Sequence, residues 1–229
     1  MSNLTQKRAD IEVDAGRLDG TLAVPEGAKG LVLFAHGTGS GRLSPRNSFV
    51  ASVLQQRAIA TLLFDLLTPA EDTEYRTRFD IDLLTQRLMI ATRWARAQFE
   101  EPGLPLGYFG ASTGAAAALR ASNLMGSATR AVVSRGGRPD LAGGEELARV
   151  RVPTLLLVGG RDTPVIALNR DVFAMLRCDK QLRVIPGAGH LFEEPGTMEQ
   201  VAQQAAEWFE QHLTSPPALS TGVEREPNS

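Results

Sequence analysis

Gly110-Ala111-Ser112-Thr113-Gly114 is the segment most diagnostic of this chain's architecture. It follows an apolar run ending in Tyr108-Phe109 and opens an alanine-rich run, Ala115 to Ala118. A strand, a G-x-S-x-G turn and a helix in that order are typical of a nucleophile elbow, which forces its serine to a positive φ. The two glycines leave room for the strand and helix backbones to pass close together. We therefore interpret Ser112 as a nucleophile, the alternative being a tight glycine turn with a solvated serine.

The composition is that of a globular protein without a nucleic-acid or membrane signature. The chain has 229 residues, 43% hydrophobic and 22% charged, with a net charge of −2 and a pI near 6.0. No basic patch predicts binding to nucleic acid, and no apolar run approaches the ~20 residues that span a bilayer. The first ten residues are polar and do not resemble a signal peptide. We expect a cytoplasmic protein.

The single cysteine, Cys178, excludes an intramolecular disulfide and any thiolate-cluster metal site. It lies between a helix pattern and a strand pattern with no histidine nearby in the sequence, so we interpret it as a structural thiol.

Apolar runs alternate with amphipathic helical patterns along the chain, which predicts an α/β fold with a mostly parallel, doubly wound sheet and helices on both faces. An antiparallel N-terminal hairpin is expected at one edge of the sheet. Strands are predicted at 11–13, 18–24, 31–35, 60–67, 104–109, 131–133, 154–158 and 182–185. Helices are predicted from Ser44-Pro45, around 81–95, after Ser112, over 164–177 and over 197–213, the last with a Thr197–Gln200 capping box.

We expect one domain over residues 11–213, an N-terminal extension at 1–10 and a disordered tail at 214–229. The connection 136–150 is too short for a separate lid domain. We therefore expect an open, shallow site.

Three loops at the carboxyl ends of predicted strands carry the residues that nucleophilic acyl transfer needs. Ser112 supplies the hydroxyl, His190 takes its proton and returns it to the leaving group, and Asp162 orients the imidazole. The order Ser, Asp, His along the chain is the order of α/β-hydrolases. These three residues are the predicted catalytic triad.

Other histidines and acids compete for these roles. His36 is predicted to brace the backbone of its glycine-rich loop, and His212 to pack in the last helix. Asp140 follows the preceding strand and is the alternative triad acid. Asp65 is expected to bind backbone groups of a loop.

An oxyanion hole needs backbone N–H groups that point at the developing charge. We expect one from Thr113 and the other from Thr38, with Gly37 as the next candidate. Four arginines, Arg42, Arg46, Arg135 and Arg138, lie in loops on the same predicted face. They are either solvated or structural, or one or two of them bind an anionic group of the substrate.

The chain resembles the α/β-hydrolase superfamily, and within it the lidless dienelactone-hydrolase-like family, from about Leu18 to Leu213. The segments that carry the resemblance are 36–39, 44–47, 65–68, 110–114, 134–140, 159–162 and 189–190. The resemblance implies the triad Ser112, Asp162 and His190. Dienelactone hydrolase itself has a cysteine nucleophile and binds its substrate carboxylate with arginines that have no residue-by-residue match here. Similar sequences also occur fused to phosphoribosyltransferase-like domains, and no such domain is expected in this chain.

Together these features predict a serine hydrolase that cleaves small carboxylic esters, with lactones and thioesters as further substrates, through an acyl-Ser112 intermediate. No metal or cofactor is expected, and the predicted partner is a small-molecule ester. The protein is expected to be a monomer or homodimer. The alternatives are an acyltransferase or peptidase with the same triad, or a catalytically silent binding module of this fold.

Overall fold

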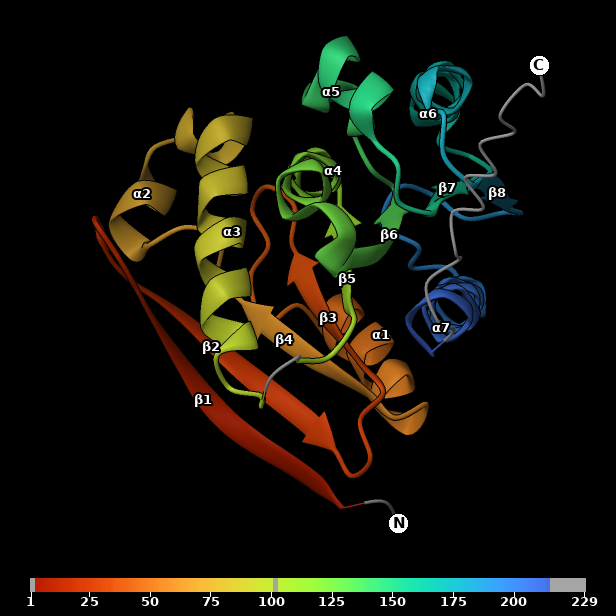
Figure 1. Cartoon of the computed structure of the whole chain (residues 1–229). Coiled ribbons are helices and arrows are strands. Elements are labelled where there is room, and N and C mark those ends of the chain that lie inside the picture. The colour runs from red at the N-terminus through yellow and green to blue at the C-terminus, as the bar shows by residue number, and fades with distance from the viewer. Residues whose placement is uncertain (1–2, 101–102, 215–229) are drawn as a thin grey trace, which may run out of the picture.

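The strands lie in one eight-stranded sheet of the computed structural model, which describes residues 3–100 and 103–214 (Figure 1). Their order in the sheet is β1-β2-β4-β3-β5-β6-β7-β8. Strands β3 to β8 are parallel to one another, and β1 and β2 form the predicted antiparallel hairpin at one edge. The bounds are β1 (Leu4–Val13), β2 (Gly16–Pro25), β3 (Gly30–Ala35), β4 (Ile59–Phe64), β5 (Leu106–Ala111), β6 (Thr129–Arg135), β7 (Thr154–Gly159) and β8 (Lys180–Ile185).

Helices cover both faces of the sheet, as the sequence predicts (Figure 1). One face holds α1 (Pro45–Gln56) and α7 (Thr197–Thr214), and the other holds α3 (Ile81–Arg96), α4 (Thr113–Met125), α5 (Gly144–Arg149) and α6 (Thr163–Met175). Strand side chains alternate between two cores: Val32 and Phe34 lie on the α1 and α7 side, whereas Leu31 and Leu33 lie on the other. Both faces are therefore buried, which explains the continuous apolar run of β3.

Short elements fill several connections. The segment between β4 and α3 holds α2 (Pro69–Thr73) and a 3₁₀ turn, Thr77–Phe79, and two further 3₁₀ turns lie at Gly126–Ala128 and Pro139–Ala142. The connection 136–150, predicted to be too short for a lid domain, contains only the last of these turns and α5. In the described part of the chain, no helix combines the length and apolarity that a membrane crossing requires.

Strand β1 begins at Leu4, so it starts seven residues earlier than the sequence predicts and includes most of the expected 1–10 extension. Leu4 pairs with Pro25, and the register continues to Val13 opposite Gly16. Residues 4–8 are all exposed, because an edge strand is held by backbone hydrogen bonds to a single neighbour. No apolar alternation therefore marks this part of the strand.

Two further predictions are corrected at chain turns. Helix α7 begins at Thr197 itself, and the Thr197 hydroxyl donates to the Glu194 carbonyl, so the predicted Thr197–Gln200 capping box is wrong. The strand predicted at 60–67 is too long at its carboxyl end. Strand β4 ends at Phe64, and Leu66 and Leu67 lie buried in the following loop. Thr214 is the last residue of α7, and the rest of the predicted tail lies outside the described residues.

The sheet topology places one crevice at the carboxyl ends of β3 and β5. The chain moves outward from β3 to β4 and then returns past β3 to β5, so the strand order reverses between these two neighbours. The helices that follow them, α1 and α4, lie on opposite faces of the sheet. Open α/β sheets bind ligands at such a reversal point. The G-x-S-x-G turn leaves β5 at this place.

Candidate active site

Ser112 sits in the strained turn between β5 and α4. Its φ of +49° lies in a region that residues other than glycine rarely adopt. A Cβ on Gly114 would lie 2.0 Å from the Ala35 carbonyl oxygen, and one on Gly110 would lie 2.5 Å from the Ala115 Cα. Both flanking glycines are therefore needed for close backbone packing, as predicted for a nucleophile elbow.

The loop after β3 lies directly against Ser112. A Cβ on Gly37 would lie 2.7 Å from the Ser112 Cβ, and the Thr38 hydroxyl lies 3.2 Å from the Thr113 hydroxyl. Thr113 is the first residue of α4, a position whose N–H has no partner inside the helix. The structure thus brings the two predicted oxyanion-hole residues, Thr38 and Thr113, together beside the Ser112 side chain.

His36 fixes the backbone of this loop. The Leu66 N–H donates to His36 Nε2 at 2.9 Å, which leaves the proton on Nδ1 to donate to the Gly37 carbonyl at 3.0 Å. Burial lowers the pKa of His36. The ring is therefore neutral with both nitrogens engaged, which agrees with the predicted bracing role and not with that of a base.

His190 and Asp162 are brought together by the loops after β8 and β7. His190 Nδ1 lies 2.6 Å from Asp162 Oδ2, the imidazole is partly exposed and the carboxylate is mostly buried. Gly136, the residue after β6, lies between this pair and the elbow: a Cβ there would lie 3.7 Å from His190 Cε1. On the other side, the carbonyl of Arg135 accepts the Ser112 N–H at 3.4 Å. Ser112, Asp162 and His190 therefore lie on neighbouring loops at one edge of the sheet.

The competing residues lie elsewhere or are engaged. Asp140 forms a two-point ion pair with Arg138, at 2.9 and 2.8 Å. His212 packs on the Trp208 ring at a centroid distance of 4.3 Å, and burial lowers its pKa. Cys178 is half-buried, and burial raises the pKa of its thiol.

Glu194 is a site residue that the sequence reasoning missed. Its Oε2 accepts the Gly189 N–H at 2.9 Å, and its Oε1 accepts from the guanidinium of Arg161. The Gly189 N–H is the main cause of the lowered pKa of Glu194. Glu194 thus ties the loop that carries His190 to the loop that carries Asp162. No sequence signal marks this role, because both contacts are set by how two loops meet.

Three of the four predicted substrate-binding arginines have acidic partners. Arg42 Nε lies 3.1 Å from Asp65, which also accepts the Arg42 N–H at 2.7 Å, so Asp65 binds loop backbone as predicted. Arg46 contacts Glu193 at 3.0 Å, and Arg138 is held by Asp140. Arg135 has no ion pair among the described residues. A hollow of about 370 Å³ opens beside these loops, lined by residues 39–46 and Asp65.

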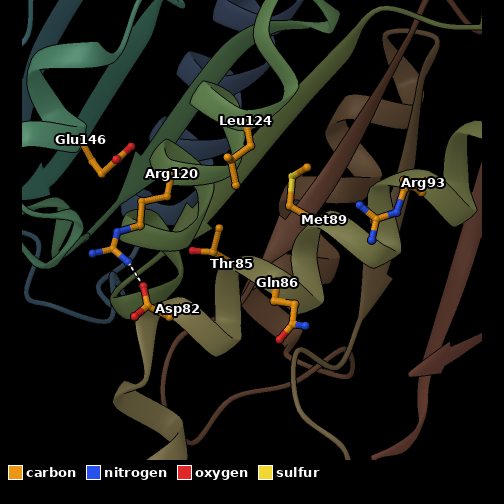
Figure 2. A pocket seen from close by; sticks show the side chains of 8 residues that line it. All are labelled: Asp82, Thr85, Gln86, Met89, Arg93, Arg120, Leu124 and Glu146. Atoms are coloured by element: carbon orange, nitrogen blue, oxygen red, sulfur yellow. Dashed lines mark hydrogen bonds and ion pairs between the residues drawn. The ribbon is translucent and has the colours of Figure 1, made fainter. Parts of the chain in front are cut away.

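A wider groove of about 690 Å³ runs between α3, α4 and α5, away from the elbow (Figure 2). Its lining includes Met89 and Leu124 and an ion pair between Arg120 and Asp82. No serine, histidine or cysteine is among the residues that line it, so the groove has no Ser–His or Cys–His pair. In residues 3–100 and 103–214, no group of three or more His, Cys, Asp or Glu side chains is placed to hold a metal ion.

Solved structures with this fold include a near relative. The chain is 52% identical to dienelactone hydrolase from Anabaena variabilis ATCC 29413, with a TM-score of 0.87 over 92% of this chain and 99% of that one. The chain belongs to the dienelactone-hydrolase-like family of α/β-hydrolases. No family model matches the sequence.

More distant members of the fold are similar in structure alone. Est1E from Butyrivibrio proteoclasticus has a TM-score of 0.77 at 13% identity, over 91% of this chain and 99% of that one. A dienelactone hydrolase-like promiscuous phosphotriesterase from metagenomic libraries has a TM-score of 0.74 at 20% identity, over 91% and 98%. These likenesses support the fold assignment.

Two relatives are longer proteins. Both come from Mycobacterium tuberculosis, are named "Putative phosphoribosyl transferase", and are 54% identical over 209 residues, which is 90% of this chain. The matched region is 47% of each relative, so the chain spans about half of their length.

Proposed function

We propose that this dienelactone-hydrolase-like protein is a serine hydrolase that cleaves small carboxylic esters through an acyl-Ser112 intermediate. The observation that carries the proposal is the strained Ser112 turn at the same sheet edge as a His190–Asp162 pair joined at 2.6 Å. The Anabaena relative, named as a dienelactone hydrolase, supports hydrolysis of a carboxylic ester bond. The phosphoribosyl transferase name belongs to relatives about twice as long and is not extended to this chain.

In the proposed mechanism, Asp162 fixes the tautomer of His190. The carboxylate accepts a hydrogen bond from the Nδ1–H group of His190. The Nε2 lone pair is then free to take the proton of Ser112. The serine oxygen attacks the ester carbonyl, and the proton passes from His190 to the departing alcohol. Water then attacks the acyl-enzyme with His190 as base, which releases the acid and restores the serine.

The oxyanion formed at each step is assigned to the N–H groups of Thr113 and Thr38. Their residues meet beside Ser112, and each such donor contributes about 10²–10³ in rate. The His36 ring holds the Gly37 carbonyl and so fixes the peptide unit between Gly37 and Thr38. Protein groups carry every step, and none requires a metal or cofactor.

The test is Ser112→Ala. The variant should no longer be labelled by a fluorophosphonate probe. Its rate of hydrolysis of 4-nitrophenyl esters of increasing acyl length should fall about 10³-fold or more. The matched control is Ser52→Ala, because that hydroxyl on α1 only donates to the Phe49 carbonyl. Turnover that survives in Ser112→Ala would contradict the mechanism.

A paired substitution tests the triad acid. Asp162→Asn should lower kcat by about 10⁴, since the amide favours the wrong imidazole tautomer. Asp140→Asn, which disturbs only the ion pair with Arg138, should retain most activity.

A folded protein with neither labelling nor turnover would indicate a silent binding module, and faster transfer to alcohols or amines than to water would indicate an acyltransferase.

A further inference from the structure

Asn169, on α6, is a buried polar side chain that the proposed mechanism does not use. The residue is 0% exposed, and its Nδ2 donates to the Gly137 carbonyl at 3.0 Å and to the Val165 carbonyl at 2.8 Å. Two carbonyl acceptors fix the orientation of the amide, because its oxygen cannot donate to either of them. Among the residues that the structure describes, the Asn169 Oδ1 has no hydrogen-bond partner.

Stability alone does not favour asparagine at this position. A buried polar atom without a partner is costly, and leucine would fill a similar volume without such an atom. The Val165 carbonyl gains little from the side chain, because inside α6 it already accepts the N–H of residue 169. The bond to the Gly137 carbonyl is therefore the one that requires the amide.

The Gly137 carbonyl belongs to the same peptide unit as the Arg138 N–H, which donates to the Ser112 carbonyl at 2.9 Å. A peptide group is planar, so a bond that fixes its carbonyl oxygen also fixes the direction of its N–H. Hydrogen bonds in such a chain also polarise and strengthen one another. The Asn169 amide thus acts on the backbone of Ser112 through a single peptide unit.

The nucleophile turn depends on such contacts. Ser112 has a φ of +49°, a strained value that persists only where the surroundings hold it. Its N–H donates to the Arg135 carbonyl at 3.4 Å, a long bond, whereas the bond from Arg138 has ordinary length. A Cβ on Gly137 would lie 2.7 Å from the Ala115 Cβ, so this loop is packed closely against α4. The Asn169 bond holds the loop from its other side.

Helix α6 carries both Asn169 and the triad acid. Asp162 is the N-cap residue of α6, and its carboxylate contacts His190 instead of capping the helix. Asn169 follows about two helical turns later, which places both residues on the same side of the helix. One rigid element therefore directs the acid toward His190 and holds the elbow through Gly137.

We propose that Asn169 is a positioning residue for the nucleophile. Through the Gly137–Arg138 peptide it holds Ser112 at the correct place relative to the Asp162–His190 pair. The inference rests on the proposed function. Loss of the amide should slow the attack by Ser112 without weakening substrate binding and without altering proton transfer by His190.

Asn169→Leu removes the amide and nearly keeps the side-chain volume. It should lower kcat/KM for 4-nitrophenyl acetate and the rate of fluorophosphonate labelling by the same factor, about 10- to 100-fold. Stopped-flow kinetics should assign the loss to the acylation rate constant and leave the dissociation constant of the ester within about threefold. The midpoint of the pH profile of kcat/KM should not move, because the Asp162–His190 contact is retained. A shifted midpoint, or a loss confined to ester binding, would overturn the proposal.

Asn169→Asp tests the hydrogen bond itself. The carboxyl can donate to the Gly137 carbonyl only when protonated, and burial favours the protonated form. At about pH 6 this variant should therefore be several-fold more active than Asn169→Leu, and any decline relative to the wild type should come as pH rises toward about 9. The ratio of Asn169→Leu to wild type should stay constant over this range. An aspartate variant no more active than the leucine variant at pH 6 would contradict the proposal.

The matched control is Asn123→Leu. The Nδ2 of Asn123, on α4, also donates to a backbone carbonyl, that of Glu146 at 2.9 Å, but this bond ties α4 to α5. The control should keep kcat/KM within about threefold of the wild type, even if its Tm falls as far as that of Asn169→Leu. Equal losses of kcat/KM in both variants would mean that activity follows stability and not the bond to Gly137, and would overturn the proposal.

Hydrogen exchange gives a readout that does not depend on turnover. The Arg138 amide should exchange at least about 10-fold faster in Asn169→Leu and at the wild-type rate in Asn123→Leu, because only the first change loosens the Gly137–Arg138 peptide. If the wild type has no Ser112-dependent turnover, the proposed function fails while exchange still tests the link from Asn169 to Ser112. An unchanged exchange rate of the Arg138 amide in Asn169→Leu would overturn that link.

Discussion

Arg87→Met is predicted to destabilise the protein by about 2–3 kcal/mol. Arg87 lies on α3 and is 2% exposed, yet it carries a charge. Its guanidinium donates to Asp14, in the turn of the β1–β2 hairpin, at 2.5 Å, and to Glu71 on α2. One side chain therefore joins the hairpin, α2 and α3.

The magnitude follows from what the substitution leaves behind. Breaking a buried ion pair costs about 3–5 kcal/mol when the remaining charge is fully buried. Glu71 would keep its bond from the Thr68 N–H and is 13% exposed, so water compensates part of the loss. Asp14 is 76% exposed and returns to solvent at little cost. Methionine fills most of the volume left by the arginine stem, which keeps the cavity contribution small.

Thermal and urea unfolding measure this loss. For a chain of this size about 2–3 kcal/mol corresponds to a fall in Tm of about 5–10 °C.

The pH dependence of the stability difference is the sharper readout. In the wild type, burial raises the pKa of Glu71, but the hydrogen bonds and charge of Arg87 and the bonds to Thr68 lower it by a larger amount. The net shift of the pKa is therefore downward. Stability from this carboxylate is present above its unfolded pKa and is lost as pH falls through the folded one.

In Arg87→Met the burial effect is opposed only by Thr68, so we expect the pKa of Glu71 to rise. Acidification then favours the folded state of the variant while it weakens the wild type. The stability difference between the two proteins should narrow as pH falls from about 6 to about 3. Asp14→Asn, which removes the exposed partner, is the control and should lower Tm less than Arg87→Met. A difference that stays constant with pH would refute the assignment of the cost to Glu71.

Two further predictions concern the elbow and the His190 loop. Gly114→Ala should cost at least about 3 kcal/mol or yield insoluble protein, because the new Cβ would lie 2.0 Å from the Ala35 carbonyl oxygen; a soluble variant with unchanged Tm would contradict this. Glu194→Gln should lower kcat about 10-fold with little change in KM, because it loosens the Gly189–His190 loop. The lowered pKa of Glu194 keeps it charged above pH 6, so this loss should be constant between about pH 6 and 9; a loss confined to KM would argue against a positioning role.

The sequence predicts those parts of the fold that depend on local sterics and on burial. The positive φ of Ser112 follows from the flanking glycines, and the parallel core strands follow from continuous apolar runs. The Thr68–Glu71 capping box is readable from its spacing, although no helix is predicted at these residues. Local patterns of this kind need no knowledge of distant partners.

Contacts between loops that are distant in sequence could not be predicted from such local patterns. Arg42, Arg135 and Arg138 look alike in the sequence, but two of them meet carboxylates and one does not. The first residues of β1 were not predicted as a strand, because this part of the edge strand is held by backbone hydrogen bonds and shows no apolar alternation. The adjacency of Thr38 and Thr113, by contrast, was predicted, because both belong to loops at the same sheet edge.

The two edges of the sheet have a consequence for how the chain behaves at high concentration. Strand β1 carries Lys7, Arg8 and Asp10 on its exposed positions, and strand β8 begins with Lys180 and includes Arg183. A second molecule that added a strand to either edge would have to desolvate these charges along with its own. The charges on both edge strands therefore oppose growth of the sheet into a continuous intermolecular β-structure.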